Sequence, residues 1–296
     1  MNKPSVTIGI PAFNEGKSIV KILNSLVSQT KENYTLDAIK VYSDGSVDNT
    51  VQLVRENFPE VTVVEHFTNR GKNIRVNEML EDNASDVFVQ VDADILIKDA
   101  NTIDNLVTAL VKNKKAGLVC SYHVAVEPTS FVGSLAYFGF RIWDTARNSL
   151  GAAGLRYYCE GGLRGFSKEL AKEFRLPVGY HVGEDSYSFY YAIENGYEVV
   201  VCKEAIVYMN LVENIKDYIQ QMKRFLLDSG MVVDVFNKNL TAKYEVLSTS
   251  VKLKALFEEF FKTPIIGICY IFLQAYTKFQ VLFYKPSASW IPPTRK

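Results

Sequence analysis

The sequence carries no excess of charge of either sign. Its 296 residues include 33 lysines and arginines and 33 aspartates and glutamates, which gives a formal net charge of +0 at pH 7. A balanced chain offers no general field that attracts a polyanion, so binding to a nucleic acid would need a local basic patch. We therefore expect no nucleic-acid partner.

Cysteine is scarce, and an apolar leader is missing. The chain has four cysteines that lie far apart and form no C-x-x-C pair: Cys120, Cys159, Cys202 and Cys269. This spacing favours free thiols in a reducing compartment. The first residues, "MNKPSVTIGIP", are too short for the apolar core of a signal peptide and lack a cleavage site. We expect a cytoplasmic protein.

A phosphate-binding loop lacks one of its requirements. The stretch "GIPAFNEGKS", Gly9–Ser18, ends in Gly-Lys-Ser like a Walker motif. That motif needs a glycine five residues before Gly16, where this chain has Pro11. Proline has no N–H and fixes φ, so it can neither donate to a phosphate nor make that turn. The stretch therefore disfavours a nucleoside triphosphatase.

What the first half does have is a regular alternation of strand and helix patterns. Apolar runs predict strands at Val6–Ile10, Ala38–Ser43, Val61–Glu65 and Asp86–Val91. Helical periodicity predicts helices at Glu15–Gln29, Asp48–Asn57 and Gly71–Glu81. Strands alternating with helices over short links predict an α/β fold with a mostly parallel sheet that helices flank on both faces. Ligands of such sheets bind beyond the carboxyl ends of the strands.

The second half is less regular. We predict strands at Ala116–Val126 and Tyr197–Cys202, helices at Ser186–Gly196 and Asn214–Gly230, and two helices within 251–285 that Pro264 separates. The change of pattern after Gly230 predicts a catalytic domain, 1–230, and a helical C-terminal extension, 231–296.

Two acidic turns follow predicted strands. "DAD" places the carboxylates of Asp92 and Asp94 two residues apart, and such hard oxygen donors suit Mn²⁺ or Mg²⁺. Alone, an Asp-x-Asp pair is more often a solvated loop. "SDGS" holds Asp44, which could accept a hydrogen bond from a nucleobase, although an Asp-Gly turn is the simpler interpretation when this motif is taken alone.

Together the motifs resemble the family 2 glycosyltransferases of the GT-A fold. "IPAFNE", "SDGS", "NRGKNIRVN", "DAD", "GED" and "QMKRF" occur in this order and cover roughly Val6 to Phe225. An ordered set is much more specific than any single motif. The resemblance implies an inverting transfer of a sugar from a nucleotide-diphosphate sugar, most simply a UDP-sugar, to a hydroxyl of a glycan or lipid-linked acceptor.

The resemblance also implies roles for individual residues. The nucleotide-sugar site would comprise Pro11, Phe13, Glu15, Asp44, Lys72, Asp92 and Arg164. Asp44 would contact the base, and Lys72 would lie near the nucleotide. Asp94 would bind the metal, Mn²⁺ or Mg²⁺, with Asp92 beside it, and the metal would stabilise the leaving diphosphate.

The "E-D" motif of the family falls in "VGEDSY". Asp185 matches the aspartate that takes the proton from the acceptor hydroxyl. The alternative is that Glu184 or Asp185 simply caps the helix that follows, and the ordered set of motifs favours the base. Glu184, together with Gln221 and Arg224 of "QMKRF", would contact the acceptor or the diphosphate.

Two departures from the family pattern limit what it implies. Phe225 stands where the motif of processive synthases has tryptophan, and this chain has no set of spanning segments, so we expect a non-processive enzyme. The stretch "EAIVYMN" lacks the histidine that many GT-A enzymes add to the metal site. The competing hypotheses are an inactive GT-A scaffold that binds a glycan or a partner, and a nucleotidyltransferase.

The last predicted helix is amphipathic. Gly267, Tyr270, Gln274 and Lys278 recur at helical spacing as one polar stripe. The other face carries Ile265, Ile268, Phe272, Tyr276 and Phe279, and lysines occur nearby at 254, 262, 278 and 285. The helix could pack on the catalytic domain, pair with a second copy in a homodimer, or lie on the cytosolic face of a membrane, which we rank slightly ahead.

Overall fold

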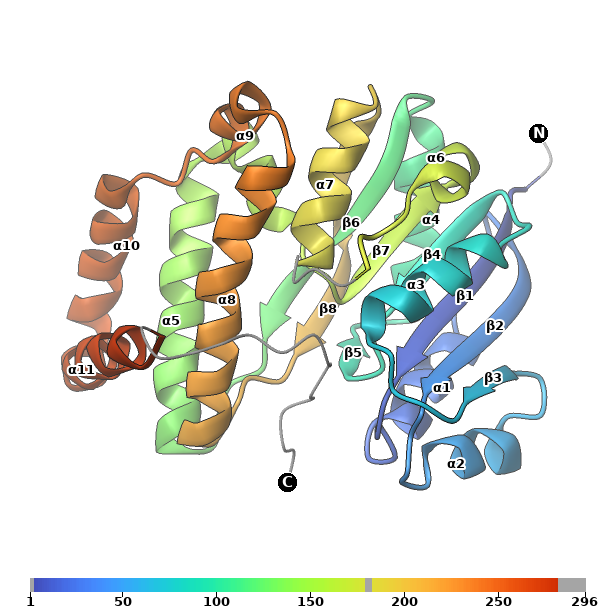
Figure 1. Ribbon diagram of the computed structural model, residues 1–296, viewed down its shortest axis with the longest axis horizontal. Coiled ribbons are helices and arrows are strands. Elements are labelled where there is room, and N and C mark those ends of the chain that lie inside the picture. The colour runs from blue at the N-terminus through green and yellow to red at the C-terminus, as the bar shows by residue number, and fades with distance from the viewer. Residues whose placement is uncertain (1–2, 179–182, 282–296) are drawn as a thin grey trace.

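One mixed sheet forms the centre of the protein (Figure 1). The computed structural model describes residues 3–178 and 183–281, with the backbone alone for residues 224, 226–234 and 281. The strands are β1 (Ser5–Ala12), β2 (Thr35–Asp44), β3 (Thr62–His66), β4 (Val87–Val91), β5 (Ile95–Ile97), β6 (Ala116–Ala125), β7 (Leu163–Ser167) and β8 (Glu198–Met209).

The strand order is β3-β2-β1-β4-β7-β6-β8-β5. The first four strands in this order pair in parallel, as do β6 and β8. β7 runs antiparallel to both of its neighbours, and β5 is antiparallel to β8. The carboxyl ends of β1, β2 and β4 and the start of β7 therefore meet at one edge of the sheet.

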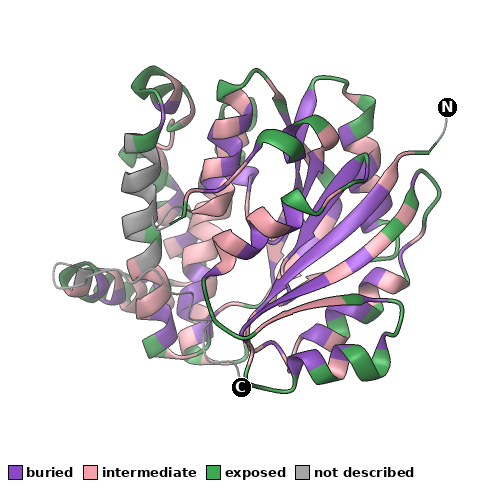
Figure 2. Ribbon diagram, turned by 45° about the vertical axis from the view of Figure 1, so that its right-hand side comes forward, coloured by how far each residue is buried: buried purple, intermediate pink, exposed green. Residues whose placement is uncertain are grey.

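Helices cover both faces of this sheet, because its central strands are apolar on both sides. Val87, Val89 and Val91 of β4 belong to one core, whereas Phe88 belongs to the other. The first core is covered by α1 (Ile19–Val27), α2 (Thr50–Asn57) and α4 (Thr102–Lys112). The second is covered by α3 (Lys72–Glu81), α6 (Lys168–Glu173) and α7 (Glu184–Glu194). Figure 2 shows the strands buried between these layers.

A helical group lies at one end of the sheet, away from β3 (Figure 1). It consists of α5 (Phe131–Ser149), the 3₁₀ helix η1 (Gly151–Tyr158), α8 (Ile215–Val235), α9 (Lys238–Tyr244), α10 (Thr249–Lys262) and α11 (Pro264–Val281). A third core joins α5, α8 and α11 around Leu135, Tyr218 and Leu273. No helix in the described ranges is long and apolar enough to cross a membrane.

The α/β alternation predicted for the first half is confirmed, with shifts at several ends. α1 begins at Ile19, so Lys17 and Ser18 lie in a turn before the helix rather than in its first turn. Ser18 and Ile19 donate their N–H groups to the carbonyl of Glu15, at 2.9 and 2.8 Å, which closes that turn. The break at Pro264 is confirmed, because α10 ends at Lys262 and α11 starts at the proline, where its missing N–H costs nothing.

Candidate active site

The loops after β1 and β2 interlock at the carboxyl edge of the sheet. Ala12 pairs with Ser43 at the end of the two strands. Asn14, which has a positive φ of 56°, then donates its N–H to Ser46 Oγ at 3.1 Å, and its Oδ1 accepts the N–H of Val47 at 2.9 Å. These hydrogen bonds join two motifs that lie some thirty residues apart in sequence into one surface.

The first motif offers unequal amounts of surface to a ligand. Pro11 is buried and Phe13 is half-buried. Glu15 is buried, donates its N–H to Thr50 Oγ1 at 2.8 Å, and accepts the hydroxyl of Ser18 on its side chain. Their contact with a nucleotide stays a prediction.

Asp44 lies below the surface, 1% exposed, and is surrounded by donors. The N–H groups of Arg70 and Gly71 reach its two oxygens at 3.0 and 2.8 Å, and Arg75 Nε donates to Oδ1 at 2.7 Å. Asp44 thus holds the start of α3 against the end of β2. A nucleobase could bond to this carboxylate only beside or in place of these donors, so that role stays a prediction.

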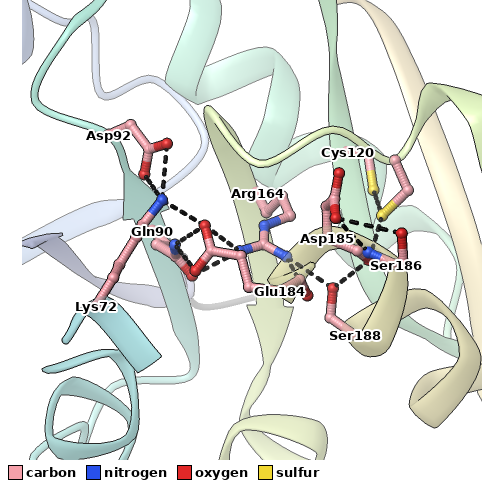
Figure 3. A network of polar contacts seen from close by, with 10 residues as sticks. Lys72, Gln90, Asp92, Cys120, Arg164, Glu184, Asp185, Ser186 and Ser188 are labelled. Atoms are coloured by element: carbon pink, nitrogen blue, oxygen red, sulfur yellow. Dashed lines mark hydrogen bonds and ion pairs between the residues drawn. The ribbon is translucent and has the colours of Figure 1, made fainter. Parts of the chain in front are cut away.

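One lysine joins the carboxylates of two motifs (Figure 3). Lys72 Nζ lies 2.7 Å from Asp92 Oδ1 and 2.9 Å from Oδ2, and it also contacts Glu184 Oε1. Lys72 is the first residue of α3, Asp92 follows β4, and Glu184 is the first residue of α7. The fold therefore brings together side chains that are up to 112 residues apart in sequence.

Burial and charge pull the pKa values of these groups in opposite directions. Burial would lower the pKa of Lys72, but Asp92 and Glu184 raise it above its ordinary value. Burial raises the pKa of Asp92 even though Lys72 lowers it. Burial would also raise the pKa of Glu184, yet Lys72 and Arg164 hold it below its usual value. The two carboxylates therefore depend on shared cations to stay charged.

Arg164 hydrogen-bonds to residues of this network. Its guanidinium donates to the carbonyl of Glu184 at 3.0 Å, to Ser188 Oγ at 2.7 Å and to Gln90 Oε1 at 3.0 Å. Gln90 in turn donates to both oxygens of Glu184 at 3.3 Å. Arg164 is buried, and its contact with a sugar stays a prediction.

Sequence reasoning missed Gln90, although a signal was present. Gln90 is a fully buried amide in a strand whose other residues are apolar. A buried polar side chain needs partners, so it often marks a site. β7 places Arg164 opposite Gln90 because the two strands pair in antiparallel register at these residues.

Asp185 is the second residue of α7, beside this network. The N-cap of α7 is Gly183, so neither Glu184 nor Asp185 occupies the capping position that the simpler interpretation gave them. Asp185 Oδ1 accepts the N–H of Ser186 at 2.6 Å. Arg156 of η1 contacts the hydroxyl of Ser186. Burial would lower the pKa of Arg156, but nearby acids, Asp185 and Glu245 among them, raise it above its ordinary value. A cation thus lies close to the carboxylate proposed as base.

A second half-buried acid lies near Asp185 and was also missed. Glu160 pairs with Arg147 of α5, and burial raises its pKa to about 7 although Arg147 lowers it. Glu160 directly precedes Gly161 and Gly162, and no motif in the sequence marked it as a functional residue. A Cβ at Gly161 would lie 3.2 Å from Glu184 Oε1, so this glycine keeps the backbone close above the network.

The two aspartates of "DAD" flank a buried residue, Ala93, and are themselves half-buried. Asp92 donates its N–H to the carbonyl of Gly162 at 2.8 Å, and Ile95 pairs with Met209 at the end of β8. The strand that lacks the expected histidine thus borders this turn. Among the described residues, no group of three or more metal-binding side chains occurs. Two carboxylates suit Mg²⁺ or Mn²⁺ when substrate oxygens and water complete the coordination.

The residues expected at the acceptor lie on different helices. Glu184 is in the ion network described above. Gln221 is half-buried on α8, and the side chain of Arg224 lies outside the described part of the chain. The structure therefore joins Glu184 to Lys72 and Asp92, while the roles of Gln221 and Arg224 stay predictions.

Comparison with known proteins decides the family. Residues 7–175 match the family model described as "Glycosyl transferase family 2". The chain belongs to this family. Protein RfbJ of Shigella flexneri is 28% identical over 110 residues, which are 37% of this chain and 79% of RfbJ. For two other curated relatives the matched part is 36% and 22% of their own length, so the chain spans well under half of those proteins.

Two solved structures of other proteins share the fold of this glycosyltransferase. A mannosyltransferase from Pyrobaculum calidifontis, in complex with GDP-Man and Mn²⁺, has a TM-score of 0.62 at 18% identity, covering 97% of this chain and 82% of that chain. Glucosyl-3-phosphoglycerate synthase from Mycobacterium tuberculosis, in complex with Mn²⁺, UDP and glucosyl-3-phosphoglycerate, has a TM-score of 0.54 at 18% identity, covering 78% and 79%. The predicted GT-A fold with a helical C-terminal region is confirmed.

Proposed function

We propose that this family 2 glycosyltransferase moves a sugar, with inversion, from a nucleotide-diphosphate sugar to a hydroxyl of a glycan or lipid-linked acceptor. The observation that carries the proposal is the meeting of Lys72, Asp92 and Glu184 at the carboxyl edge of the sheet. Three of the six ordered motifs supply these residues, and ligands of α/β sheets bind at this edge.

The donor that we propose is a UDP-sugar. The interlocked loops after β1 and β2, the first of which begins with the half-buried Phe13, would receive the nucleoside. Lys72 supplies a cation for the diphosphate, provided that it exchanges part of its contact with Asp92 and Glu184 for phosphate oxygens. GDP-sugars are the alternative, since one structural neighbour holds GDP-Man.

The residues that we propose to hold a divalent ion are Asp94 and Asp92. A carboxylate pair in a half-buried turn fits a cation that shares its coordination with substrate oxygens. Mn²⁺ is our first choice because two structural neighbours are complexes with Mn²⁺, and Mg²⁺ is the alternative. When bound, such an ion stabilises the negative charge of the leaving diphosphate.

Asp185 is the base in this proposal. The acceptor oxygen attacks the anomeric carbon while the bond from that carbon to the diphosphate breaks, and the acceptor proton passes to the Asp185 carboxylate. No enzyme nucleophile is needed for a single displacement, and one displacement inverts the anomeric configuration. Arg156, which contacts Ser186, places a positive charge near Asp185.

We propose that the enzyme is non-processive and works at the cytosolic side. Phe225 replaces the tryptophan of the processive motif and is an exposed residue on α8. The division of the chain into two domains at residue 230 also stays a proposal. α8 continues across this position to Val235.

A donor screen tests the proposal. The full chain is mixed with UDP- and GDP-sugars, with Mn²⁺, Mg²⁺ or a chelator, and both thermal stabilisation and products are measured. We expect a metal-dependent nucleoside diphosphate and, with acceptor, a product of inverted anomeric configuration by NMR. Inorganic pyrophosphate as product would instead identify a nucleotidyltransferase, and binding without any turnover would identify an inactive scaffold.

A further inference from the structure

The last two helices expose a large apolar surface. The outer face of α10 and α11 consists of Leu253, Phe257, Phe261, Ile265, Ile268, Ile271, Phe272, Tyr276 and Phe279, all of them exposed. Ile265 and Phe272 are each 73% exposed. Single exposed apolar residues need no explanation, but nine on two consecutive helices mark an interaction surface.

α11 is attached to the protein by its more polar side. Gln274 Nε2 donates to the hydroxyl of Tyr218 on α8 at 2.8 Å, and Tyr270 packs on Phe138 of α5 with ring centroids 5.2 Å apart. Thr277 is buried and donates to the carbonyl of Leu273 at 2.8 Å. Of the polar stripe predicted from the sequence, Gly267, Tyr270 and Gln274 thus face inward, the reverse of a helix on the surface of a soluble domain, whereas Lys278 is exposed.

Polar contacts also help to fix α10. Arg141 of α5 lies 3.1 Å from the buried carboxylate of Glu259 and donates to Thr263 Oγ1 at 2.9 Å. Thr145 donates to Glu259 at 3.0 Å. These bonds hold α10 against α5, and both α10 and α11 lie at the end of the molecule away from β3 (Figure 1).

The charges around the outer face are mostly positive. Four exposed lysines accompany it: Lys252, Lys254, Lys262 and Lys278. Glu258 is the exposed acid between residues 249 and 281. In a two-fold dimer through this face each copy would present the same lysines to the other, which opposes pairing. An anionic lipid surface complements both the apolar side chains and the lysines.

We propose that the outer face of α10 and α11 docks the protein on an anionic lipid bilayer, with the apolar side chains in the interface and the lysines at the headgroups. It deepens the proposed function in one respect only: a lipid-linked acceptor would be carried by the surface on which the enzyme lies. Vesicle binding itself needs no sugar transfer, so the two proposals fail separately.

Cosedimentation of the full chain with vesicles tests the proposal. We expect binding to phosphatidylglycerol-containing vesicles at low salt, weaker binding at high salt, and little binding to phosphatidylcholine alone. The variant Phe261→Ser/Ile265→Ser/Phe272→Ser should lose binding. The control Val47→Ser/Phe67→Ser/Val111→Ser, which changes three exposed apolar residues on other elements, should keep it.

A lysine variant keeps the proposal testable even where the serine variant fails to fold. In Lys252→Gln/Lys254→Gln/Lys278→Gln, partitioning onto anionic vesicles should fall roughly fivefold per lysine while donor hydrolysis in solution is retained. Wild-type protein that stays in the supernatant at low salt overturns the proposal. A dimer that the serine variant splits would then identify an interface between copies, and a monomer would indicate that another part of the chain covers the face.

Discussion

Replacing Lys72 with methionine tests the ion network most directly. Methionine keeps an unbranched side chain, one heavy atom shorter than that of lysine, but removes the charge that Asp92 and Glu184 share. Two unit charges 2.7 Å apart, the Lys72–Asp92 distance, attract by about 6 kcal/mol at an effective dielectric constant of about 20. Desolvation of the lysine offsets part of this attraction. Removing one partner of a buried pair typically costs about 3–5 kcal/mol.

The side chains of Lys72 and Asp92 are 18% and 21% exposed, so water screens the pair in part. We therefore expect Lys72→Met to lower the free energy of unfolding near neutral pH by about 3 kcal/mol. In the variant, the pKa values of Asp92 and Glu184 rise, because Lys72 lowers both in the native protein. Raised carboxylate pKa values cost stability above the unfolded pKa of about 4 and cost little below it.

The loss should therefore shrink to about 1 kcal/mol near pH 4, where both carboxylates of the variant bind protons. Urea unfolding at the two pH values measures it. Lys98→Met is the matched control, because Lys98 lies 3.9 Å from Asp99 in an exposed pair, which is typically worth under about 1 kcal/mol. A loss for Lys72→Met that equals the control, or that does not change with pH, would refute the reasoning.

Three further substitutions address the proposed chemistry. Asp94→Ala should remove the Mn²⁺-dependent thermal stabilisation by UDP while the free protein stays folded, and unchanged Mn²⁺ dependence would rule out Asp94 as a ligand. Asp185→Asn should lower kcat by about 10²-fold or more with nucleotide affinity little changed; activity within a few-fold of wild type would place the base elsewhere. Gly161→Ala puts a methyl group 3.2 Å from Glu184 Oε1 and 3.9 Å from Asp92 Oδ2. It should weaken donor binding by about 1 kcal/mol, and an unchanged donor KM would show that the donor does not lie over this network.

The first half of the fold could be predicted because its signals are local. β1 and β4 are apolar runs buried along almost their whole length, β2 is buried over its last residues, and helices with apolar stripes of their own occur between these strands. α5 had no such signal. It contains Gly133 and Gly139 among many aromatics, and a Cβ at Gly139 would lie 2.8 Å from Tyr270 of α11. That helix is fixed by packing that only the folded protein provides.

β7 was missed for a similar reason. Its five residues, "LRGFS", are short for a strand pattern and include Gly165, where a Cβ would lie 2.7 Å from Val119 of β6. A glycine is needed here because the side chain of Val119 occupies the space that a Cβ would take. Missing β7 also hid the reason why Arg164 meets Gln90, since strand register, rather than any motif, places them opposite each other.

The motifs predicted residues that meet in the site, but they did not predict the contacts between the site and the C-terminal extension. Glu245, just after α9, accepts the hydroxyl of Tyr190 of α7 at 2.6 Å and lies 3.5 Å from Arg156 Nε. Arg156 contacts Ser186, whose N–H bonds to Asp185. No periodicity or motif marks a glutamate at the end of a short helix as a partner of a residue sixty positions earlier.

These contacts bear on how the extension and the catalytic part are related. Asp185 and Glu245 are linked through two side chains only, Ser186 and Arg156. Ser186 lies in α7, and Arg156 lies in η1 and contacts both Ser186 and Glu245. An extension that begins at residue 231 therefore contains a group that acts on the surroundings of the proposed base. The outer face of α10 and α11 lies beyond Glu245 in sequence and is held to α5 by separate bonds. In the proposed division, the same extension thus contacts the site through Glu245 and presents the proposed lipid-docking surface through α10 and α11.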